Sequence, residues 1–286
     1  MRVLVTGGAG FIGRYVCKEL WAQGHEPLVF DIAAPIPQDV RQPGQVQDAM
    51  RHADACIHLA GILGNPETVS DPYPCVQTNI LGSLNVFEAA GSKPVVFPAV
   101  GNKWLRETGT GGYTITKSCV EDFIAMYNKC RGSTIAIVRP VNCYGPGQKV
   151  PAPWGPGTVR KIMPTFIAQA LHGQDIEVYG NGSHTSDMVY VTDVARNIVG
   201  VLGTNGVWGI GPIESHTVLQ VAKMVEQEVY NQTGVILPHG VVFRDMPTSE
   251  VPGVTALHET MWEYPRVDLV EGIALTVASY LPGRER

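Results

Sequence analysis

Near its start the sequence reads Arg2-Val3-Leu4-Val5-Thr6-Gly7-Gly8-Ala9-Gly10-Phe11-Ile12-Gly13. The short apolar run at residues 3–5 is typical of a buried strand in a parallel sheet. The glycines Gly7, Gly10 and Gly13 then allow a tight turn, a close approach of the backbone to a pyrophosphate, and close packing of the next helix on the sheet. The stretch therefore predicts a strand, a dinucleotide-binding turn and the start of a helix.

The residues after the turn complete a strand–helix–strand unit. A helix is expected over about residues 11–23, with its N-terminal N–H groups and positive dipole end directed at the phosphates. Residues 26–30 follow as the second strand, and Asp31 stands at its end. A carboxylate at this place accepts hydrogen bonds from both ribose hydroxyls and repels a 2′-phosphate. We therefore predict NAD rather than NADP as the cofactor.

Strands and helices of similar length alternate through the first half of the chain. Further strands are expected at about 54–61, 93–100 and 134–138, and helices at about 43–51, 77–90 and 113–131. This alternation predicts an α/β fold with a doubly wound parallel (Rossmann) sheet. Residues 62–74, which include three prolines and several polar residues, are expected to form a loop.

The composition changes after Gly147, where prolines and glycines break any regular element. Beyond it, helices are expected at 163–172, 193–202 and 219–231, and a short strand at 177–179. We predict that residues 1–147 form an NAD-binding domain and residues 148–286 a smaller substrate-binding domain over the carboxyl edge of the sheet. A return of residues 187–203 to the first domain is left open.

Composition excludes several classes of protein. A net charge of −5 over 286 residues argues against a general nucleic-acid binder. No apolar run reaches the length of a membrane span. The six cysteines lack metal-ligand spacing and the histidines are isolated, so we expect free thiols and no metal site. The first strand follows Met1 directly, from which we expect no signal peptide and a cytoplasmic protein.

A second signal lies in the segment Tyr113-Thr114-Ile115-Thr116-Lys117. The spacing places the phenol and the ammonium on one face of a helix. A phenol ordinarily ionises at about pH 10. A nearby ammonium favours the phenolate and lowers its pKa, as does the positive charge of an oxidised nicotinamide. The pair is therefore suited to exchange a proton with a carbinol while hydride moves to or from nicotinamide.

Further segments accompany these two signals, in this order along the chain: Asp39-Val40, His58-Leu59-Ala60-Gly61, Thr78-Asn79-Ile80-Leu81-Gly82-Ser83-Leu84-Asn85-Val86, Arg139-Pro140-Val141-Asn142-Cys143-Tyr144-Gly145-Pro146-Gly147, Val178-Tyr179-Gly180-Asn181-Gly182-Ser183, Met188-Val189-Tyr190-Val191-Thr192-Asp193-Val194-Ala195 and Trp262-Glu263-Tyr264-Pro265. With them, the chain resembles the extended short-chain dehydrogenase/reductase family, in its NAD-dependent nucleotide-sugar epimerase/dehydratase branch. The resemblance covers nearly the whole chain.

The resemblance implies roles for the matched positions. Tyr113 would act as the base, and Lys117 would hold the nicotinamide ribose. Both would contact NAD, together with Gly7, Gly10, Phe11, Ile12, Gly13, Asp31, Ile32, Asp39, Val40, Leu59, Ala60, Gly61 and Pro140. The substrate would be a nucleotide sugar bound by Asn142, Tyr179 and Arg244. The family also pairs as homodimers through the helices at 77–90 and 113–131, whose apolar faces fit an ordinary core equally well.

One departure from the family concerns the reacting hydroxyl. The family carries Ser or Thr after the strand that precedes the Tyr–Lys helix, whereas residues 96–102 contain no hydroxyl. Loss of such a donor lowers the rate by orders of magnitude unless another group replaces it. Asn102, Thr114 and Thr116 are the candidates. The acidic residue that dehydratases and decarboxylases place next to that hydroxyl is absent as well, which disfavours 4,6-dehydration.

A second departure concerns the phosphates. Relatives place an arginine before the aspartate that here is Asp187, but this chain has Ser186. Loss of a bidentate phosphate clamp weakens the case for a nucleotide diphosphate, unless Arg160 or Lys161 replaces it.

The leading hypothesis is an NAD-dependent nucleotide-sugar epimerase acting at C4 through a transient 4-keto intermediate. One alternative is an NAD-dependent dehydrogenase or reductase acting on a smaller carbonyl or alcohol, which the two departures suggest. The other is a catalytically weakened NAD-binding protein that works through partners. The presence of both Tyr113 and Lys117 argues against this last reading.

Overall fold

The computed structural model describes residues 1–63, 65–101, 111–149, 161–245 and 260–281. The chain divides into two compact units. The first comprises Met1–Pro140, Val191–Ile210 and His258–Glu263. The second comprises Val141–Tyr190, Gly211–Leu257 and Tyr264–Arg286. Among the helices that the structure describes, none combines the length and apolar content that a bilayer span requires.

The first unit is built on a six-stranded sheet with the order β2-β1-β3-β4-β5-β9. Its strands are β1 (Arg2–Thr6), β2 (Glu26–Phe30), β3 (Ala55–His58), β4 (Val95–Pro98), β5 (Ile135–Pro140) and β9 (Gly206–Ile210). Every neighbouring pair is parallel. The prediction of a doubly wound parallel sheet is therefore confirmed. Strand β9 was not expected from the sequence.

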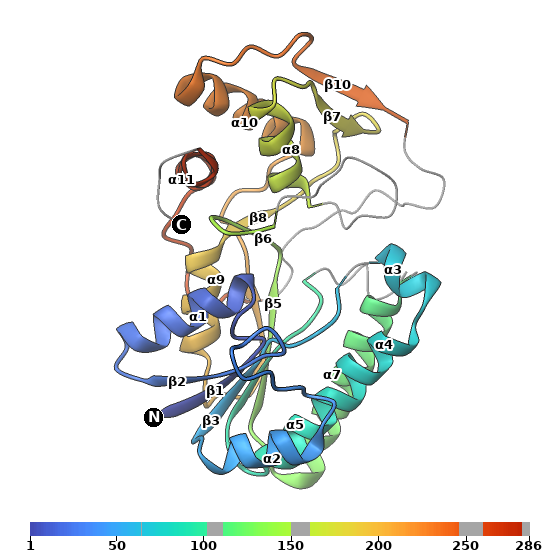
Figure 1. Cartoon of the computed structure of the whole chain (residues 1–286), viewed down its shortest axis with the longest axis vertical. Coiled ribbons are helices and arrows are strands. Elements are labelled where there is room, and N and C mark those ends of the chain that lie inside the picture. Colours follow the sequence, from blue (N-terminus) through green and yellow to red (C-terminus); the bar gives the residue numbers. More distant parts are fainter. Residues whose placement is uncertain (64, 102–110, 150–160, 246–259, 282–286) are drawn as a thin grey trace. The chain divides into compact units, whose positions relative to one another are not determined.

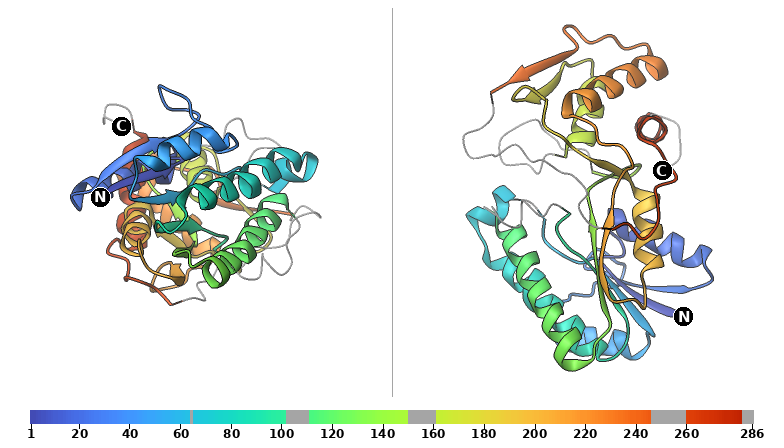
Figure 2. Two further views of the ribbon diagram at one scale, coloured as in Figure 1. Left: turned by 90° about the horizontal axis from the view of Figure 1, so that it is seen from below. Right: turned by 180° about the vertical axis from the view of Figure 1, so that it is seen from behind.

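Helices cover both faces of this sheet (Figures 1 and 2). They are α1 (Phe11–Ala22) and α9 (Val191–Gly200) on one side, and α2 (Pro43–Arg51), α5 (Gly82–Ala90) and α7 (Gly112–Arg131) on the other. All four residues of β3 are buried, as expected for a central strand covered on both faces. Phe87 and Phe97 anchor the core between the sheet and α5.

The prediction of a loop over residues 62–74 is wrong. The structure has two short helices there, α3 (Asn65–Ser70) and α4 (Tyr73–Cys75), followed by the π-helix η1 (Val76–Leu81) that runs into α5. Pro74 lies in the first turn of α4. A proline is tolerated there because the N–H that it lacks has no intrahelical partner.

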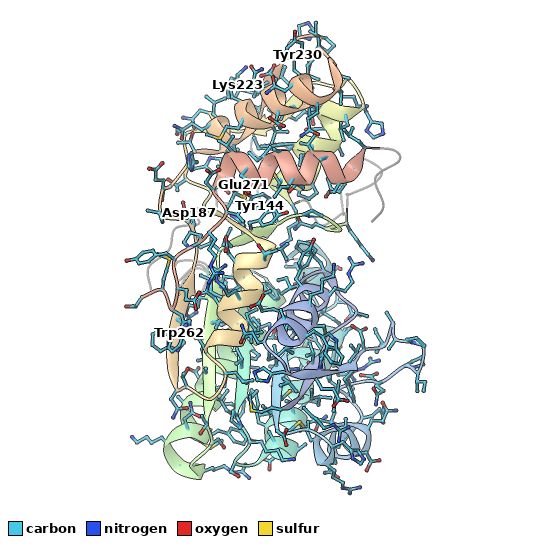
Figure 3. The ribbon with its side chains drawn as sticks, turned by 90° about the vertical axis from the view of Figure 1, so that its left-hand side faces the viewer. Tyr144, Asp187, Lys223, Tyr230, Trp262 and Glu271 are labelled. Carbon is cyan, nitrogen blue, oxygen red and sulfur yellow. The ribbon has the colours of Figure 1, made fainter. Side chains whose placement is uncertain are left out.

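The segment at residues 260–263 belongs to the first unit and packs on α9. A side chain on Gly200 of α9 would overlap the ring of Trp262, with Cβ 2.7 Å from Nε1 (Figure 3). Trp262 also meets Trp208 edge to face, with ring centroids 5.0 Å apart. Arg196 of α9 donates to Glu263 at 2.8 Å. These contacts explain why late segments of the chain return to the first unit.

In the second unit, the residues that the structure describes form two small parallel sheets and three helices. The sheets pair β6 (Asn142–Tyr144) with β8 (Met188–Tyr190), and β7 (Ile176–Tyr179) with β10 (Val241–Arg244). The helices are α8 (Ile162–Leu171), α10 (Val218–Thr233) and α11 (Leu269–Tyr280). Helix α11, not expected from the sequence, lies against Tyr144, where a side chain on Gly272 would overlap the phenol oxygen (Figure 3).

Candidate functional site

The glycine-rich turn has no room for side chains. Gly7 has a φ of +70°, a conformation that favours glycine. A Cβ on Gly7 would lie 2.8 Å from the Ala60 nitrogen. A Cβ on Gly13 would overlap the Gly7 carbonyl oxygen and lie 2.7 Å from the Gly8 Cα. The turn is thus packed closely against the segment after β3 and the first turn of α1, and the backbone N–H groups at the start of α1 are of the kind that can bind a phosphate.

The turn also lies where the order of the strands reverses. β2 lies on one side of β1 and β3 on the other. In open parallel sheets, ligands bind outside the carboxyl ends of the strands at this switch point. Leu59, Ala60 and Gly61 follow β3 at that point. The small residues at both strand ends fit a dinucleotide.

Asp31 is held by backbone groups on both sides. One carboxylate oxygen accepts the N–H of Ala9 at 3.0 Å, and the other accepts the N–H of Ala33 at 2.9 Å. These bonds fix the carboxylate beside the turn, as a ribose-binding group requires. Ile32, the next residue, has an exposed side chain.

Asp39 and Val40 lie at the loop that leads into α2. The carboxylate of Asp39 is paired with Arg41, at 2.6 Å, and this hydrogen-bonded pair lowers its pKa. Val40 is buried and packs against Gly82 of α5. Val40 therefore serves the packing of the first unit, whatever contact it makes with adenine.

Substitution of Gly13 by alanine tests the turn. We expect Gly13→Ala to weaken NAD binding at least about 100-fold, or about 2.7 kcal/mol, because the overlapping backbone must move apart. Calorimetric titration with NAD measures this. Gly44→Ala, where a Cβ meets nothing within 4 Å, is the matched control. Equal NAD affinity in the two variants would contradict the role assigned to the turn.

Helix α7 carries Tyr113 and Lys117 in successive turns. The Lys117 ammonium donates to the Pro98 carbonyl at 2.9 Å and lies 4.2 Å from the centroid of the Phe97 ring. A Cβ on Gly61 would be 3.8 Å from it, so the ammonium lies beside the segment that follows β3. Burial lowers the pKa of Lys117 to about 8, opposed by the nearby Cys75 and Glu121.

The expectation that Lys117 lowers the pKa of Tyr113 is not borne out. Burial, followed by nearby Cys75, raises the pKa of Tyr113 to about 12. Desolvation disfavours the charged phenolate and outweighs any attraction to the ammonium. In the state described here the phenol is protonated at neutral pH. The positive charge of oxidised nicotinamide, when bound, would act in the opposite direction.

The position of α7 is set from two places. At its start, the hydroxyl of Thr68 accepts the N–H of Tyr113 at 3.3 Å, since Gly111 offers no side-chain cap. Further along, Glu121 forms a buried bidentate ion pair with Arg139 of β5. Arg139 also donates to the carbonyl of Val100 at 3.0 Å. The ion pair therefore fixes the helix, the sheet and the segment after β4 together.

The structure separates the three candidates for the missing hydroxyl, which are Asn102, Thr114 and Thr116. Residues 99–101 after β4 are Ala, Val and Gly, and Asn102 lies outside the described residues. Thr116 is excluded because its hydroxyl donates to the carbonyls of Gly112, at 2.7 Å, and Tyr113, and accepts from Asn79 at 3.0 Å. Thr114 is buried and remains a candidate. Pro140, expected near the nicotinamide, ends β5 and is half-buried.

The predicted substrate residues lie in the second unit. Tyr179 and Arg244 are register partners in the β7–β10 sheet, so the structure brings these two together. Arg244 is paired with Glu177 at 2.8 Å. Asn142 lies in the other sheet, where its amide nitrogen donates to the Ser186 hydroxyl and the Asp187 carbonyl, both at 3.1 Å.

Ser186 is therefore part of the support of Asn142. Lys161, immediately before α8, is one of the two candidates for the missing phosphate clamp. Burial lowers its pKa, opposed by Cys143. Arg160, the other candidate, lies outside the described residues. In the part of the chain that the structure describes, no three His, Cys, Asp or Glu side chains group as metal ligands.

His58, at the end of β3, was singled out by the sequence only as part of a motif. Its side chain is fully buried, and Nδ1 and Nε2 contact the hydroxyls of Thr6, at 2.6 Å, and Ser83, at 3.0 Å. Burial, followed by the charge of Lys117, lowers the pKa of His58 to about 3. The imidazole is therefore neutral throughout the physiological range.

This burial predicts a pH dependence of stability. Below about pH 6.5 the unfolded chain protonates His58 while the folded protein does not. The free energy of unfolding is thus expected to fall by up to about 1.4 kcal/mol per pH unit between pH 6.5 and 3 from this group. Urea unfolding at several pH values measures it. His58→Gln should show a shallower slope over this window, and an unchanged slope would contradict the assignment.

Comparisons with known proteins agree with this geometry. The model of the family described as "NAD dependent epimerase/dehydratase family" matches residues 3–211. A UDP-N-acetyl-alpha-D-glucosaminuronate decarboxylase from Bacillus cytotoxicus is 27% identical, with 96% of each chain covered. Two crystal structures align over 98% of both chains. One is a Thermus thermophilus UDP-glucose 4-epimerase in complex with NAD, 27% identical with a TM-score of 0.75. The other is a Thermotoga maritima UDP-glucose 4-epimerase with UDP-glucose, 25% identical with a TM-score of 0.79.

Proposed function

Because this chain belongs to the NAD dependent epimerase/dehydratase family, we propose that it is a nucleotide-sugar epimerase that inverts C4 through a transient 4-keto intermediate. The observation that carries the proposal is the Tyr113–Lys117 pair on α7, with the Lys117 ammonium beside the segment that follows β3. The named activities of the two similar crystal structures support the choice of reaction and of a UDP-sugar.

In this proposal the first unit binds NAD. Gly7, Gly10 and Gly13 let the dinucleotide approach the backbone, the N–H groups of Phe11 and Ile12 bind its pyrophosphate, and Asp31 binds its ribose. NAD held there would supply a reversible acceptor for hydride.

The residues of α7 carry the proton. The Tyr113 oxygen takes the proton of the C4 hydroxyl as hydride leaves C4. Lys117, together with the positive charge that bound oxidised nicotinamide would bring, stabilises the phenolate that precedes this step. The 4-keto sugar then rotates so that its other face is presented. Tyr113 returns the proton to the C4 oxygen as hydride reaches the opposite face of C4. The proton is therefore recycled on one phenol, and the reaction needs no external oxidant.

The second unit binds the nucleotide part of the substrate in this proposal. Tyr179 contacts the base, Arg244 a phosphate and Asn142 the sugar diphosphate. Arg244 is paired with Glu177, so a phosphate must compete with, or add to, that pair. With Ser186 in the place of an arginine, Lys161 is the described cation best suited to a second phosphate contact.

A second candidate function is decarboxylation of a nucleotide-linked uronic acid. The similarity to the Bacillus cytotoxicus decarboxylase favours it. The same Tyr113 chemistry at C4 would precede loss of carbon dioxide. Residues 98–101 contain no carboxylate, which favours epimerisation of the two.

We also propose a homodimer that pairs through α7 and η1. Phe87 and Val120, two residues of the expected apolar faces, are buried in the first unit's own core. Met126, Ile115 and Leu81 remain 38%, 57% and 51% exposed, respectively. Burial of such a surface between two copies would explain their exposure. Light scattering after gel filtration should give the mass of a dimer, and a concentration-independent monomer would contradict the pairing.

The reaction is tested with a panel of UDP- and dTDP-linked sugars and uronic acids in deuterated water. Anomeric proton signals are followed by NMR in the presence of NAD. The proposal expects the C4 epimer of one sugar to appear, without net formation of NADH. Conversion of a nucleotide-linked uronic acid to a pentose would show that the protein is a decarboxylase and not an epimerase. Net NADH formation with a small alcohol would point to a dehydrogenase instead.

A further inference from the structure

A chain of hydrogen bonds crosses the first unit beneath the glycine-rich turn. It starts at the N–H of Ala60, which donates to the Thr6 hydroxyl at 3.2 Å. Thr6 contacts Nδ1 of His58 at 2.6 Å, and Nε2 of His58 contacts the Ser83 hydroxyl at 3.0 Å. Ser83 donates to the main-chain carbonyl of Asn79 at 2.5 Å. Thr6, His58, Ser83 and Asn79 are all buried.

The donors in this chain can be assigned. Ser83 has one hydroxyl proton and gives it to a carbonyl, which can only accept. Its oxygen must therefore accept from Nε2 of His58, which carries the ring proton. Burial and the charge of Lys117 lower the pKa of the imidazole to about 3, so Nδ1 is unprotonated and accepts from Thr6. Every bond then runs in one direction, from Ala60 to Asn79.

The far end of the chain contacts the Tyr–Lys helix. The Asn79 side chain accepts from the N–H of Ile62 at 2.8 Å and donates to its carbonyl at 3.0 Å. The same amide donates to the Thr116 hydroxyl of α7 at 3.0 Å. Asn79 lies in the π-helix η1, and π-helical turns are frequent at functional sites. The hydrogen bonds thus connect Thr6 at the end of β1, immediately before the glycine turn, with the segment after β3 and the helix of Tyr113 and Lys117.

We propose that His58 and Ser83 are positioning residues that hold Asn79, and through it α7, in register with the dinucleotide turn. Neither side chain reaches the reacting atoms. Their effect is to place Lys117 opposite the nicotinamide half of a dinucleotide whose adenosine half is fixed by the turn and Asp31. The inference rests on NAD binding at this turn and is independent of which sugar is converted.

Loss of the Ser83 hydroxyl is expected to weaken binding of the nicotinamide half of NAD without weakening binding of the ADP-ribose half. Ser83→Ala leaves the His58 Nε2–H and the Asn79 carbonyl without their partner, so α7 is free to shift relative to the turn. NAD affinity should fall about tenfold, the loss expected when a buried hydrogen bond is broken. The affinity for ADP-ribose, which lacks the nicotinamide, should stay within about threefold, since its contacts lie on the turn.

Ser118→Ala is the matched control. Ser118 lies on α7, and its buried hydroxyl has no hydrogen-bond partner among the described residues. This variant should leave both affinities unchanged. Calorimetry of NAD and ADP-ribose on the three proteins gives the result. If Ser83→Ala weakens both ligands equally, or neither, the positioning role is overturned. Failure of every sugar to react would refute the proposed epimerase but leave this binding result intact.

A second measurement determines the protonation of His58 in the wild-type protein and uses a variant only to assign the signal. Long-range ¹H–¹⁵N NMR of the wild-type protein reports the protonation of each imidazole nitrogen, and His58 is assigned by its absence in His58→Gln. The directed chain requires a neutral ring with the proton on Nε2. A ring protonated on Nδ1, or on both nitrogens at neutral pH, would overturn the proposal.

Discussion

Replacement of Tyr113 by phenylalanine is expected to lower kcat by about 10²–10⁴-fold, the contribution of a positioned general acid/base. The ring is kept, so the packing of α7 and the affinity for NAD should change little. The loss should appear in the hydride-transfer step, because no other phenol on α7 lies in the turn next to Lys117. Single-turnover absorbance of the reduced nicotinamide, with the sugar identified by the panel, measures that step.

Tyr127→Phe provides the control for this substitution. Tyr127 is on the same helix but donates to Glu88 of α5, and Arg131 stacks on its ring. Its loss should cost about 0.5–1.5 kcal/mol of stability and leave hydride transfer unchanged. If Tyr113→Phe retained the rate of Tyr127→Phe, Tyr113 would not be the base.

Removal of Glu121 is expected to have the largest effect on stability. In the intact pair the side chains of Glu121 and Arg139 are only 4% and 5% exposed, respectively. Glu121→Ala therefore leaves the Arg139 guanidinium buried without its carboxylate. Breaking one side of such a pair should lower the free energy of unfolding by about 3–5 kcal/mol. Because Arg139 also holds the Val100 carbonyl, the segment after β4 should loosen as well. Urea denaturation monitored by far-UV circular dichroism measures the loss.

Two controls bracket that result. The double variant Glu121→Leu with Arg139→Met removes both charges and should recover much of the lost stability, since apolar pairs often replace buried ion pairs without loss. Asp48→Ala breaks an exposed pair with Arg51 and should change stability by less than about 1 kcal/mol. A loss for Glu121→Ala no greater than for Asp48→Ala would contradict the structural role of the pair.

The sequence was sufficient for the elements that depend on local patterns. The glycine turn, the alternation of strands and helices, and the Tyr113–Lys117 spacing predicted a Rossmann sheet with the expected order of its early elements, which the structure confirms. The prediction of a loop over residues 62–74 was wrong because the prolines were interpreted as helix breakers. Pro74 lies in the first turn of a helix, where proline is tolerated. Strand β9 was not predicted because its glycine-containing sequence has no clear strand pattern. It forms a strand because it pairs with β5.

Features that depend on tertiary contacts were out of reach. The hydrogen bonds of His58 join residues 52 and 25 positions away in the sequence, and no local pattern indicates such partners. The burial that raises the pKa of Tyr113 could not be predicted, because a spacing shows the neighbouring charge but not the depth of burial. Thr116 was a candidate hydroxyl until the structure showed its engagement with Asn79.

The central claim is that hydride passes between C4 of a bound sugar and NAD held on the glycine turn, with Tyr113 as the base. It is tested most directly with the converted nucleotide sugar carrying deuterium at C4, in ordinary water. The account predicts that the epimer keeps its deuterium at C4 while the absorbance of reduced nicotinamide rises and decays within a single turnover. Loss of the label to solvent, or turnover without reduced nicotinamide, would contradict it.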